Sequence, residues 1–174
     1  MTRILGAVLA GGRSRRFGSD KAVAMLGEMT LIEHAIAGLT PQVDAVLVCG
    51  RSIDGVTSVA DRPAPDLGPL GGLNAALCHA AANGFEAVVT IPCDMPLLPA
   101  DLVARLRRAG AASFVAGMPV VGLWPASLAR ALDALLVEDG DRSMHGWAAR
   151  VGALPVAIEG LVNVNTPADL RGLA

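Results

Sequence analysis

A loop rich in glycine and cationic residues follows the first apolar stretch of the chain. The segment LAGGRSRRFGSDK, residues 9–21, contains two adjacent glycines and four cations: Gly11, Gly12, Arg13, Arg15, Arg16 and Lys21. Glycines let a backbone approach a ligand closely and adopt positive φ. Exposed amides together with Arg16 and Lys21 would form a compact site for a polyphosphate. The segment fits neither G-x-x-x-x-G-K-[ST] nor G-x-G-x-x-G, and a solvated surface loop remains the alternative.

A carboxylate stands at the end of the most strand-like run. In IPCDMPLLP, residues 91–99, Asp94 lies between two prolines. The carboxyl edge of a parallel sheet is where open α/β folds bind ligands. Facing a polyphosphate there, a carboxylate is a natural Mg²⁺ ligand, because this hard ion prefers oxygen. The alternative is that Asp94 only caps the next turn.

Two further segments carry polar residues or glycines at the ends of predicted elements. DRPAPDLGPLGG, residues 61–72, places Asp61 at a strand end and three glycines around a predicted helix start. NVNTP, residues 163–167, has Asn163 and Asn165 at alternate positions of an extended segment, so both side chains face one way. Thr166 is interpreted as a helix N-cap.

Short β-type runs alternate with helical patterns in the first half, which predicts βαβ units and an α/β fold with a mainly parallel sheet. Strands are predicted over 3–10, 44–50, 57–61, 86–93, 113–117, 119–124 and 154–158. Helices are predicted over 30–39, 69–84, 99–109, 126–138 and 143–151, and from Pro167 onward. Thr30 and Glu33 form a candidate capping box, and the run 86–93 should be a central strand.

The composition bounds the classes of function. The chain has 174 residues, so we expect one domain over 1–174. A net charge of −2 gives no overall attraction to nucleic acid or to a membrane surface, so any anion site must be local. The cysteines at 49, 78 and 93 show no metal-type spacing and are expected to be buried thiols. Without a secretory pattern or an apolar run of about 20 residues, a cytoplasmic protein is expected.

In this order, LAGG-x-S-x-R-F-G-x-D-K, GPLGG, PCDMP and NVNTP resemble the molybdenum cofactor guanylyltransferase family. The resemblance implies a Rossmann-like three-layer α/β/α nucleotidyltransferase fold. It also implies a magnesium-dependent transfer of GMP from GTP to the terminal phosphate of the molybdenum-bound molybdopterin, with pyrophosphate as the second product. Transient contacts with cofactor-delivery proteins and target molybdoenzymes are implied as well.

The resemblance also implies a role for each matching residue. Backbone groups of Leu9, Ala10, Gly11 and Gly12 would touch the nucleotide. Lys21 and Arg16 would bind the phosphates and the leaving pyrophosphate, and Asp94 would hold Mg²⁺. Asp61 would contact guanine, Gly68 and Gly72 would line the same pocket, and Asn163 and Asn165 would face the acceptor.

These roles suit the chemistry. Guanine presents two adjacent donors, N1–H and an exocyclic amine, and a carboxylate such as Asp61 can accept a hydrogen bond from each. Adenine does not present this pair of donors. Two positions depart from the family: Cys49 stands where an asparagine is frequent, and Met118 replaces a polar residue before proline. A cytidylyltransferase for the same cofactor, a sugar-phosphate nucleotidyltransferase and a non-catalytic GTP-binding module remain as alternatives.

Overall fold

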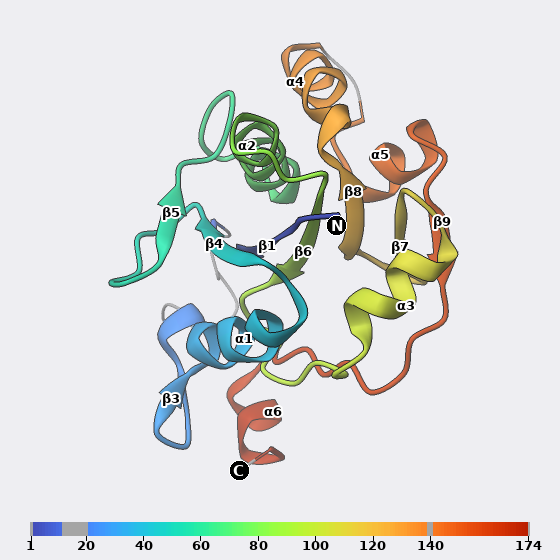
Figure 1. The fold of residues 1–174 in the computed structure, drawn as a ribbon. Helices are drawn as coiled ribbons and strands as arrows, with labels where there is room; N and C mark the ends of the chain where they lie inside the picture. Colours follow the sequence, from blue (N-terminus) through green and yellow to red (C-terminus); the bar gives the residue numbers. More distant parts are fainter. Residues whose placement is uncertain (1, 12–20, 139–140, 174) are drawn as a thin grey trace.

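The computed structural model describes residues 2–11, 21–138 and 141–173, and its main feature is one seven-stranded sheet (Figure 1). The strands are β1 (Ile4–Leu9), β4 (Ala45–Cys49), β5 (Thr57–Val59), β6 (Ala87–Pro92), β7 (Ser113–Val115), β8 (Met118–Pro125) and β9 (Leu154–Val156). Their order across the sheet is β5-β4-β1-β6-β8-β7-β9. Only β8 runs antiparallel to its neighbours in this sheet, which confirms the mainly parallel α/β fold.

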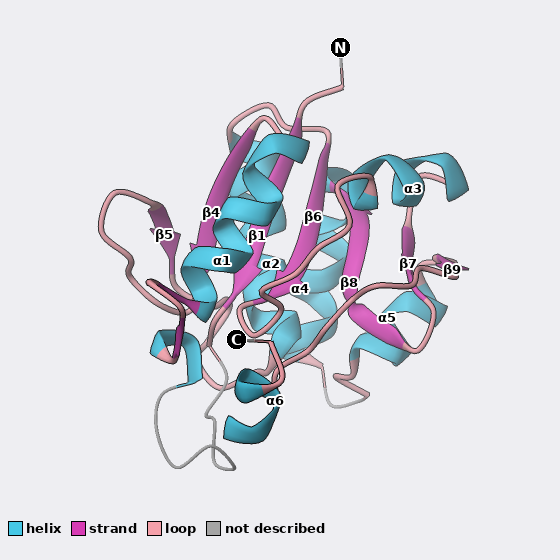
Figure 2. Ribbon diagram, turned by 90° about the horizontal axis from the view of Figure 1, so that it is seen from below, coloured by secondary structure: helices cyan, strands magenta, loops and turns pink. Residues whose placement is uncertain are grey.

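Helices cover both faces of the sheet. They are α1 (Leu31–Leu39), α2 (Pro69–Ala82), α3 (Leu102–Ala109), α4 (Ala129–Val137), α5 (Met144–Arg150) and α6 (Pro167–Arg171), with short 3-10 turns η1 (Lys21–Val23), η2 (Thr40–Gln42) and η3 (Ala126–Leu128). Helices α1 and α3 pack on one face, and α2, α4 and α5 pack on the other (Figures 1 and 2). The result is the expected three-layer α/β/α arrangement.

The central strand β1 shows why the sheet is buried on both sides. All six of its residues are buried, as expected for a parallel strand between two helical layers. Leu5, Ala7 and Leu9 pack into the core beneath α2, α4 and α5. Ile4 and Val8 pack into the core beneath α1 and α3. The period-2 alternation of a strand therefore feeds both cores at once.

The chain reverses its direction of travel across the sheet at β1. It passes from β1 through α1 to β4 on one side, and later through α2, on the opposite face, to β6 on the other side. The carboxyl ends of β1 and β6 therefore flank a topological switch point, where open α/β sheets leave a crevice for ligands. The predicted central position of the 86–93 run is confirmed, since β6 is the fourth of seven strands.

The capping box predicted for the first helix is present. The Glu33 carboxylate accepts hydrogen bonds from the N–H and the hydroxyl of Thr30, both at 2.7 Å, and Thr30 Oγ1 accepts one from Glu33 N at 3.4 Å. This cap could be predicted from the sequence because its two partners are only three residues apart.

The third helix begins later than predicted, at Leu102 and not at Pro99. The reason is a long-range cap from Gln42. Its side-chain amide donates to Pro99 O at 3.1 Å, and its side-chain carbonyl accepts from Val103 N at 3.2 Å. This contact holds residues 99–101 as a turn ahead of the helix, an arrangement that depends on a residue 57 positions away.

A small hairpin, β2 (Met25–Leu26) and β3 (Met29–Thr30), was not expected from the sequence. It lies beside α1, and His34 of α1 binds the Leu26 carbonyl oxygen through Nε2 at 2.8 Å. The predicted helix over 126–138 is divided into η3 and α4. Within the described ranges, no helix has the length and apolar character that a membrane span requires.

Candidate functional site

The carboxyl ends of three neighbouring strands form the candidate site. Leu9 at the end of β1 is in register with Cys49 of β4 on one side and with Pro92 of β6 on the other. Past these pairs, Ala10 N donates to Cys49 O at 2.9 Å and Cys93 N donates to Leu9 O at 3.1 Å. The ladder thus continues one residue beyond the strands and brings the segments that follow all three together.

Lys21 and Asp94 meet at this edge. Lys21 begins η1, and its Nζ lies 2.7 Å from Oδ2 of Asp94, which follows β6. Their side chains are only 10% and 19% exposed, so the pair is largely shielded from solvent. A charge pair in such a place is much less screened than one at the surface. Lys21 is also the only lysine in the sequence.

The segment around Asn165 joins the same cluster. Lys21 Nζ donates a second hydrogen bond, of 3.1 Å, to Oδ1 of Asn165. Val164 N donates to the backbone oxygen of Asp94 at 2.9 Å. Asn163 Oδ1 is buried and has no hydrogen-bond partner among the described residues. The NVNTP segment therefore lies against the Lys21–Asp94 pair.

Asp61 lies in a cradle of glycines on the β4 side of β1. A Cβ added to Gly11 would stand 2.8 Å from Asp61 Oδ2, and one added to Gly50 would stand 3.1 Å from Oδ1. A Cβ added to Gly71 of α2 would stand 3.3 Å from Asp61 Cβ, and one added to Gly72 would stand 3.6 Å from Asp61 Oδ1. Four glycines therefore let three backbone segments, the ends of β1 and β4 and the first turns of α2, come close to one carboxylate.

The Asp61 carboxylate is placed to accept hydrogen bonds from a ligand. Its Oδ1 is buried and unpartnered within the part of the chain that the structure describes. Burial raises the pKa of Asp61 above its ordinary value, and repulsion from the Asp66 carboxylate raises it further. An acceptor that has lost its water without gaining a protein donor is costly, and such a group is a candidate for ligand recognition.

The segment that carries Asp61 is fixed to α2. Arg62 N donates to Gly71 O at 3.1 Å. Behind this contact, the fully buried Asn74 donates through Nδ2 to Asp133 Oδ1 of α4 at 2.8 Å, and Arg62 Nη2 lies 3.8 Å from the same oxygen. The packing of α2 against α4 thereby holds the Asp61 loop beside the sheet edge.

Glycine is required at positions 68 and 72 for different structural reasons. Gly68 is the N-cap residue of α2 with φ of 65°, and a Cβ there would meet nothing within 4 Å. Its glycine serves the backbone conformation. Gly72 lies within α2, where a Cβ would stand 3.0 Å from Leu9 Cδ2 and 3.2 Å from Cys49 Cβ. Its glycine lets the helix approach the strand ends.

Asp94 fits a divalent cation of the hard type. Oδ2 is bound to Lys21, whereas Oδ1 is buried and has no hydrogen-bond partner among residues 2–11, 21–138 and 141–173. The same described ranges contain no group of three or more His, Cys, Asp or Glu side chains able to hold a metal. One carboxylate with an available oxygen suits Mg²⁺, which keeps several waters and takes further ligands from substrate phosphates.

The cysteines behave as ordinary thiols. Cys49, Cys78 and Cys93 are free, and Cys49 is fully buried. Burial, followed by the charge of Asp94, raises the pKa of Cys93 to about 11. A thiol with such a pKa stays protonated at neutral pH and is a poor nucleophile, so its place beside Asp94 gives it no covalent chemistry.

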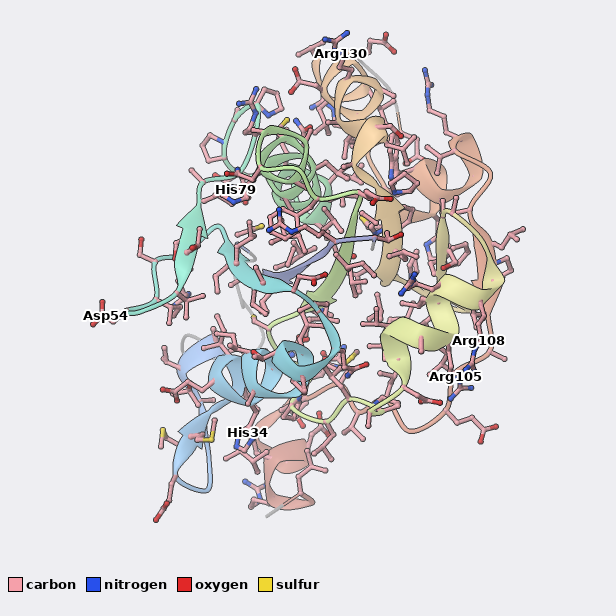
Figure 3. The ribbon with its side chains drawn as sticks, in the orientation of Figure 1. His34, Asp54, His79, Arg105, Arg108 and Arg130 are labelled. Carbon is pink, nitrogen blue, oxygen red and sulfur yellow. The ribbon has the colours of Figure 1, made fainter. Side chains whose placement is uncertain are left out.

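Part of the predicted phosphate loop lies outside the described residues. Gly12 and Arg16 lie outside the described residues, as do Arg13 and Arg15. Among the described cations, Arg105 and Arg108 on α3 and Arg130 on α4 are at the periphery of the molecule (Figure 3).

Sequence reasoning missed three residues of the site. Gly50 follows β4 directly, so its position at a strand end was the available signal. Gly71 adjoins Gly72 in the predicted segment. Asp169 completes a capping box with Thr166, and its spacing of three residues from the predicted N-cap could have indicated it.

Comparisons with known proteins show the family of the chain. Residues 6–151 match the model of the MobA-like NTP transferase domain. A molybdenum cofactor guanylyltransferase from Rhizobium leguminosarum bv. trifolii (strain WSM2304) is 40% identical over 189 residues, covering 97% of this chain and 90% of its own length.

Solved structures support the same fold. Molybdopterin-guanine dinucleotide biosynthesis protein A from Archaeoglobus fulgidus superposes with a TM-score of 0.76 at 24% identity, covering 97% of this chain and 96% of that one. A 4-diphosphocytidyl-2C-methyl-D-erythritol synthase superposes with a TM-score of 0.72 at 14% identity, covering 99% and 97%. At these identities the likeness concerns the fold, which is that of Rossmann-like nucleotidyltransferases.

Proposed function

Because the chain belongs to the MobA-like NTP transferase family, we propose that it is a molybdenum cofactor guanylyltransferase. It transfers GMP from GTP to the terminal phosphate of the molybdenum-bound molybdopterin and releases pyrophosphate. The observation that carries the proposal is the shielded pair of Lys21 and Asp94 at the switch point of the sheet, 2.7 Å apart. It offers one cation for phosphates and one carboxylate for a metal at the same place.

In the proposed reaction, an oxygen of the acceptor phosphate attacks the α-phosphorus of GTP. A phosphorus–oxygen bond forms there, and the bond from the α-phosphorus to the bridging oxygen breaks. That oxygen leaves with the electron pair as part of pyrophosphate. The acceptor oxygen is already ionised, so no general base is needed. Catalysis then consists of alignment and charge stabilisation.

Lys21 supplies charge stabilisation at the phosphates. Its ammonium is held by Asp94 and Asn165, so it is oriented before a substrate binds. A preorganised cation costs little reorganisation as charge develops on the leaving group. Arg16 and the backbone of Gly11 and Gly12, which precede η1 in the sequence, are proposed to share this task.

Asp94 is proposed as the ligand of Mg²⁺. Its buried, unpartnered Oδ1 is the atom that would hold the ion. When bound, Mg²⁺ would neutralise charge on the phosphates and favour departure of pyrophosphate. The contact of Lys21 with Oδ2 fixes the orientation of the carboxylate.

Asp61 is proposed to select guanine. Its desolvated carboxylate can accept from guanine N1–H and from the exocyclic amine, whereas cytosine lacks this pair of adjacent donors. Leu9, Ala10, Gly68 and Gly72 would line the same pocket. The close approach of Gly11 and Gly72 to Asp61 supports a base bound against flat backbone at this position.

Asn163 and Asn165 are proposed to face the acceptor. Both lie in the segment that reaches the Lys21–Asp94 pair, and Asn163 Oδ1 is an unpartnered buried acceptor among the described residues. A cytoplasmic location is proposed together with this reaction. Cofactor-delivery proteins and target molybdoenzymes are its proposed transient partners.

The test is a transfer assay with purified protein, Mg²⁺ and molybdenum-loaded molybdopterin. Supply of GTP should release pyrophosphate and form the guanine dinucleotide cofactor, and CTP should not replace it. Thermal unfolding offers a second measurement, because a ligand that binds only the native state raises the melting temperature. If product forms with CTP and not with GTP, the protein is a cytidylyltransferase. GTP binding without pyrophosphate release would favour a non-catalytic module.

A further inference from the structure

A continuous set of hydrogen bonds connects α6 to the proposed catalytic pair. It begins at Asp169 in the first turn of α6 and ends at Asp94 after β6. The proposed function uses Lys21, Asp94 and Asn165 but gives Asp169 no task. Asp169 touches neither strand end, so its contribution must pass through another residue.

The first step is the capping box of α6. Asp169 Oδ2 accepts from Asn165 N at 2.7 Å and from Thr166 N at 2.8 Å. Asp169 N in turn donates to Thr166 Oγ1 at 3.3 Å. One carboxylate oxygen therefore fixes two consecutive peptide groups, and the first of them belongs to Asn165.

The second step runs from Asn165 to Lys21. Asn165 Oδ1 accepts a hydrogen bond from Lys21 Nζ at 3.1 Å, while Lys21 Nζ donates another to Asp94 Oδ2 at 2.7 Å. The ammonium is thus held between two oxygens that come from distant parts of the chain. Val164 N also donates to Asp94 O at 2.9 Å, so the same segment is attached to both members of the pair.

A lysine needs such support. Its side chain has four rotatable bonds, and ordering it costs much conformational entropy. With a metal ion bound, Asp94 would share its charge with the ion, and its hold on Lys21 would weaken. Asn165 is the neutral partner that can keep the ammonium in place during that exchange, provided that its own backbone is fixed.

We propose that Asp169 is a positioning residue for Lys21, acting through the backbone of Asn165. The inference rests on the proposed function for its consequence in catalysis, but the positioning itself concerns residues of the free protein. The hydrogen bonds from Asn165 and Thr166, with a smaller effect of Lys21, lower the pKa of Asp169. Its carboxylate is therefore charged at neutral pH, in the form that this role requires.

The chain makes a direct test possible because Lys21 is its only lysine. Acetic anhydride at limiting concentration will modify Lys21 and the α-amino group, and mass spectrometry of peptides separates the two. The rate of modification reports how firmly the ammonium is held, and it needs no substrate. Asp169→Ala should raise the rate at Lys21 several-fold and leave the rate at the α-amino group unchanged.

Kinetics supply the second measurement. Loss of alignment from a distant change can cost up to about 100-fold in rate, and for Asp169→Ala we expect the KM for GTP to rise roughly ten-fold with a smaller change in kcat. Asp169→Glu should restore both measurements, because glutamate is the usual partner in a capping box. In a Lys21→Ala background, Asp169→Ala should have no further effect on KM, since the two changes act through one group.

Glu33→Ala is the matched control. Glu33 closes the capping box of α1 in the same way, and its two hydrogen bonds remain within that box. It should leave the acetylation rate of Lys21 unchanged. Equal acetylation of Lys21 in Asp169→Ala and wild type would overturn the proposal, as would an equal effect of Glu33→Ala. If Asp169→Ala speeds acetylation but the wild type transfers no GMP, the positioning stands and the proposed function fails.

Discussion

The ammonium nitrogen of Lys21 lies 2.7 Å from Oδ2 of Asp94, although the two residues are 73 positions apart in the sequence. The contact joins η1, which follows the glycine-rich segment in the sequence, to the chain just after the central strand β6. Both side chains are mostly buried, so neither charge can be altered without consequence for the other. This pair determines what a substitution of Asp94 should do.

Replacement of Asp94 should stop turnover and keep the fold. Asp94→Ala removes the proposed metal ligand, and the loss of one group that stabilises transition-state charge costs about 100- to 1,000-fold in kcat. Asp94→Asn should be equally inactive while leaving Lys21 a neutral oxygen acceptor. Pyrophosphate release measures the turnover of each variant, and circular dichroism measures whether its fold is kept. Asp101→Asn, an exposed carboxylate seven residues later, should remain active, and an active Asp94→Ala enzyme would exclude Asp94 as the metal ligand.

Asp61→Asn should weaken the preference for guanine. A site that pairs with particular donors discriminates strongly against a base that lacks them, and we expect the preference for GTP over CTP to fall by about 100-fold or more. The amide keeps the shape of the side chain but offers only one acceptor oxygen. Competition of the two nucleotides in the transfer assay measures the ratio. An unchanged ratio would place guanine recognition elsewhere in the pocket.

Acidification should reduce GTP affinity through Asp61 before it affects an ordinary aspartate. Burial and the neighbouring Asp66 raise the pKa of Asp61 above its usual 3.8. Protonation removes the acceptor that guanine needs, so the Kd for GTP should increase as pH falls through the raised pKa. Isothermal titration across this range tests the effect, and Asp61→Asn should lose that component of the pH dependence.

The same shift has a consequence for stability. A carboxyl group whose pKa is higher in the folded than in the unfolded state favours folding at low pH, and this contribution is lost as pH rises through the folded pKa. At neutral pH the ionised Asp61 should therefore destabilise the fold, and Asp61→Asn should melt at a higher temperature than wild type. The difference should shrink below pH 3.8. A lower melting temperature at neutral pH would contradict this account.

Gly50 should tolerate no side chain. Its φ is +79°, and a Cβ there would stand 2.5 Å from Gly11 Cα. Gly55 has a similar φ of +75°, but nothing lies within 4 Å of its added Cβ. Both alanine variants place a side chain at positive φ, so both lose stability through backbone strain. The alanine at Gly50 also meets the Gly11 backbone, and we expect this contact to lower the free energy of unfolding by about 1–3 kcal/mol more than the alanine at Gly55. Urea denaturation measures the free energy of unfolding of both variants. Equal losses would show that the backbone around Gly11 and Gly50 moves apart without cost.

The fold was predictable from sequence where local patterns decide it. The buried strand at 87–92, the helix at 31–39 and its Thr30–Glu33 cap all follow from periodicity and short spacing. The start of α3 was not predictable, because Gln42 sets it from another part of the chain. The β2–β3 hairpin has strands of two residues, too short for a pattern to indicate.

The candidate site divides in a similar way. Asp94 and the glycines at strand and helix ends could be found because such ends meet at one edge of a parallel sheet. The hydrogen bond between Asn165 and Lys21 could not, since it depends on how residues 163–169 return to the sheet. The part played by Asp169 becomes visible only when the backbone of Asn165 is in place.

The sequence holds 14 basic residues, and Lys21 is the single lysine among them. Attachment chemistries that target amines therefore have only that side chain and the α-amino group to react with. A fluorophore, a cross-linker or a bead coupled to Lys21 would occupy the proposed phosphate position, and protein labelled at that side chain should be inactive. Immobilisation of an active enzyme must instead use the exposed carboxylates or an added tag.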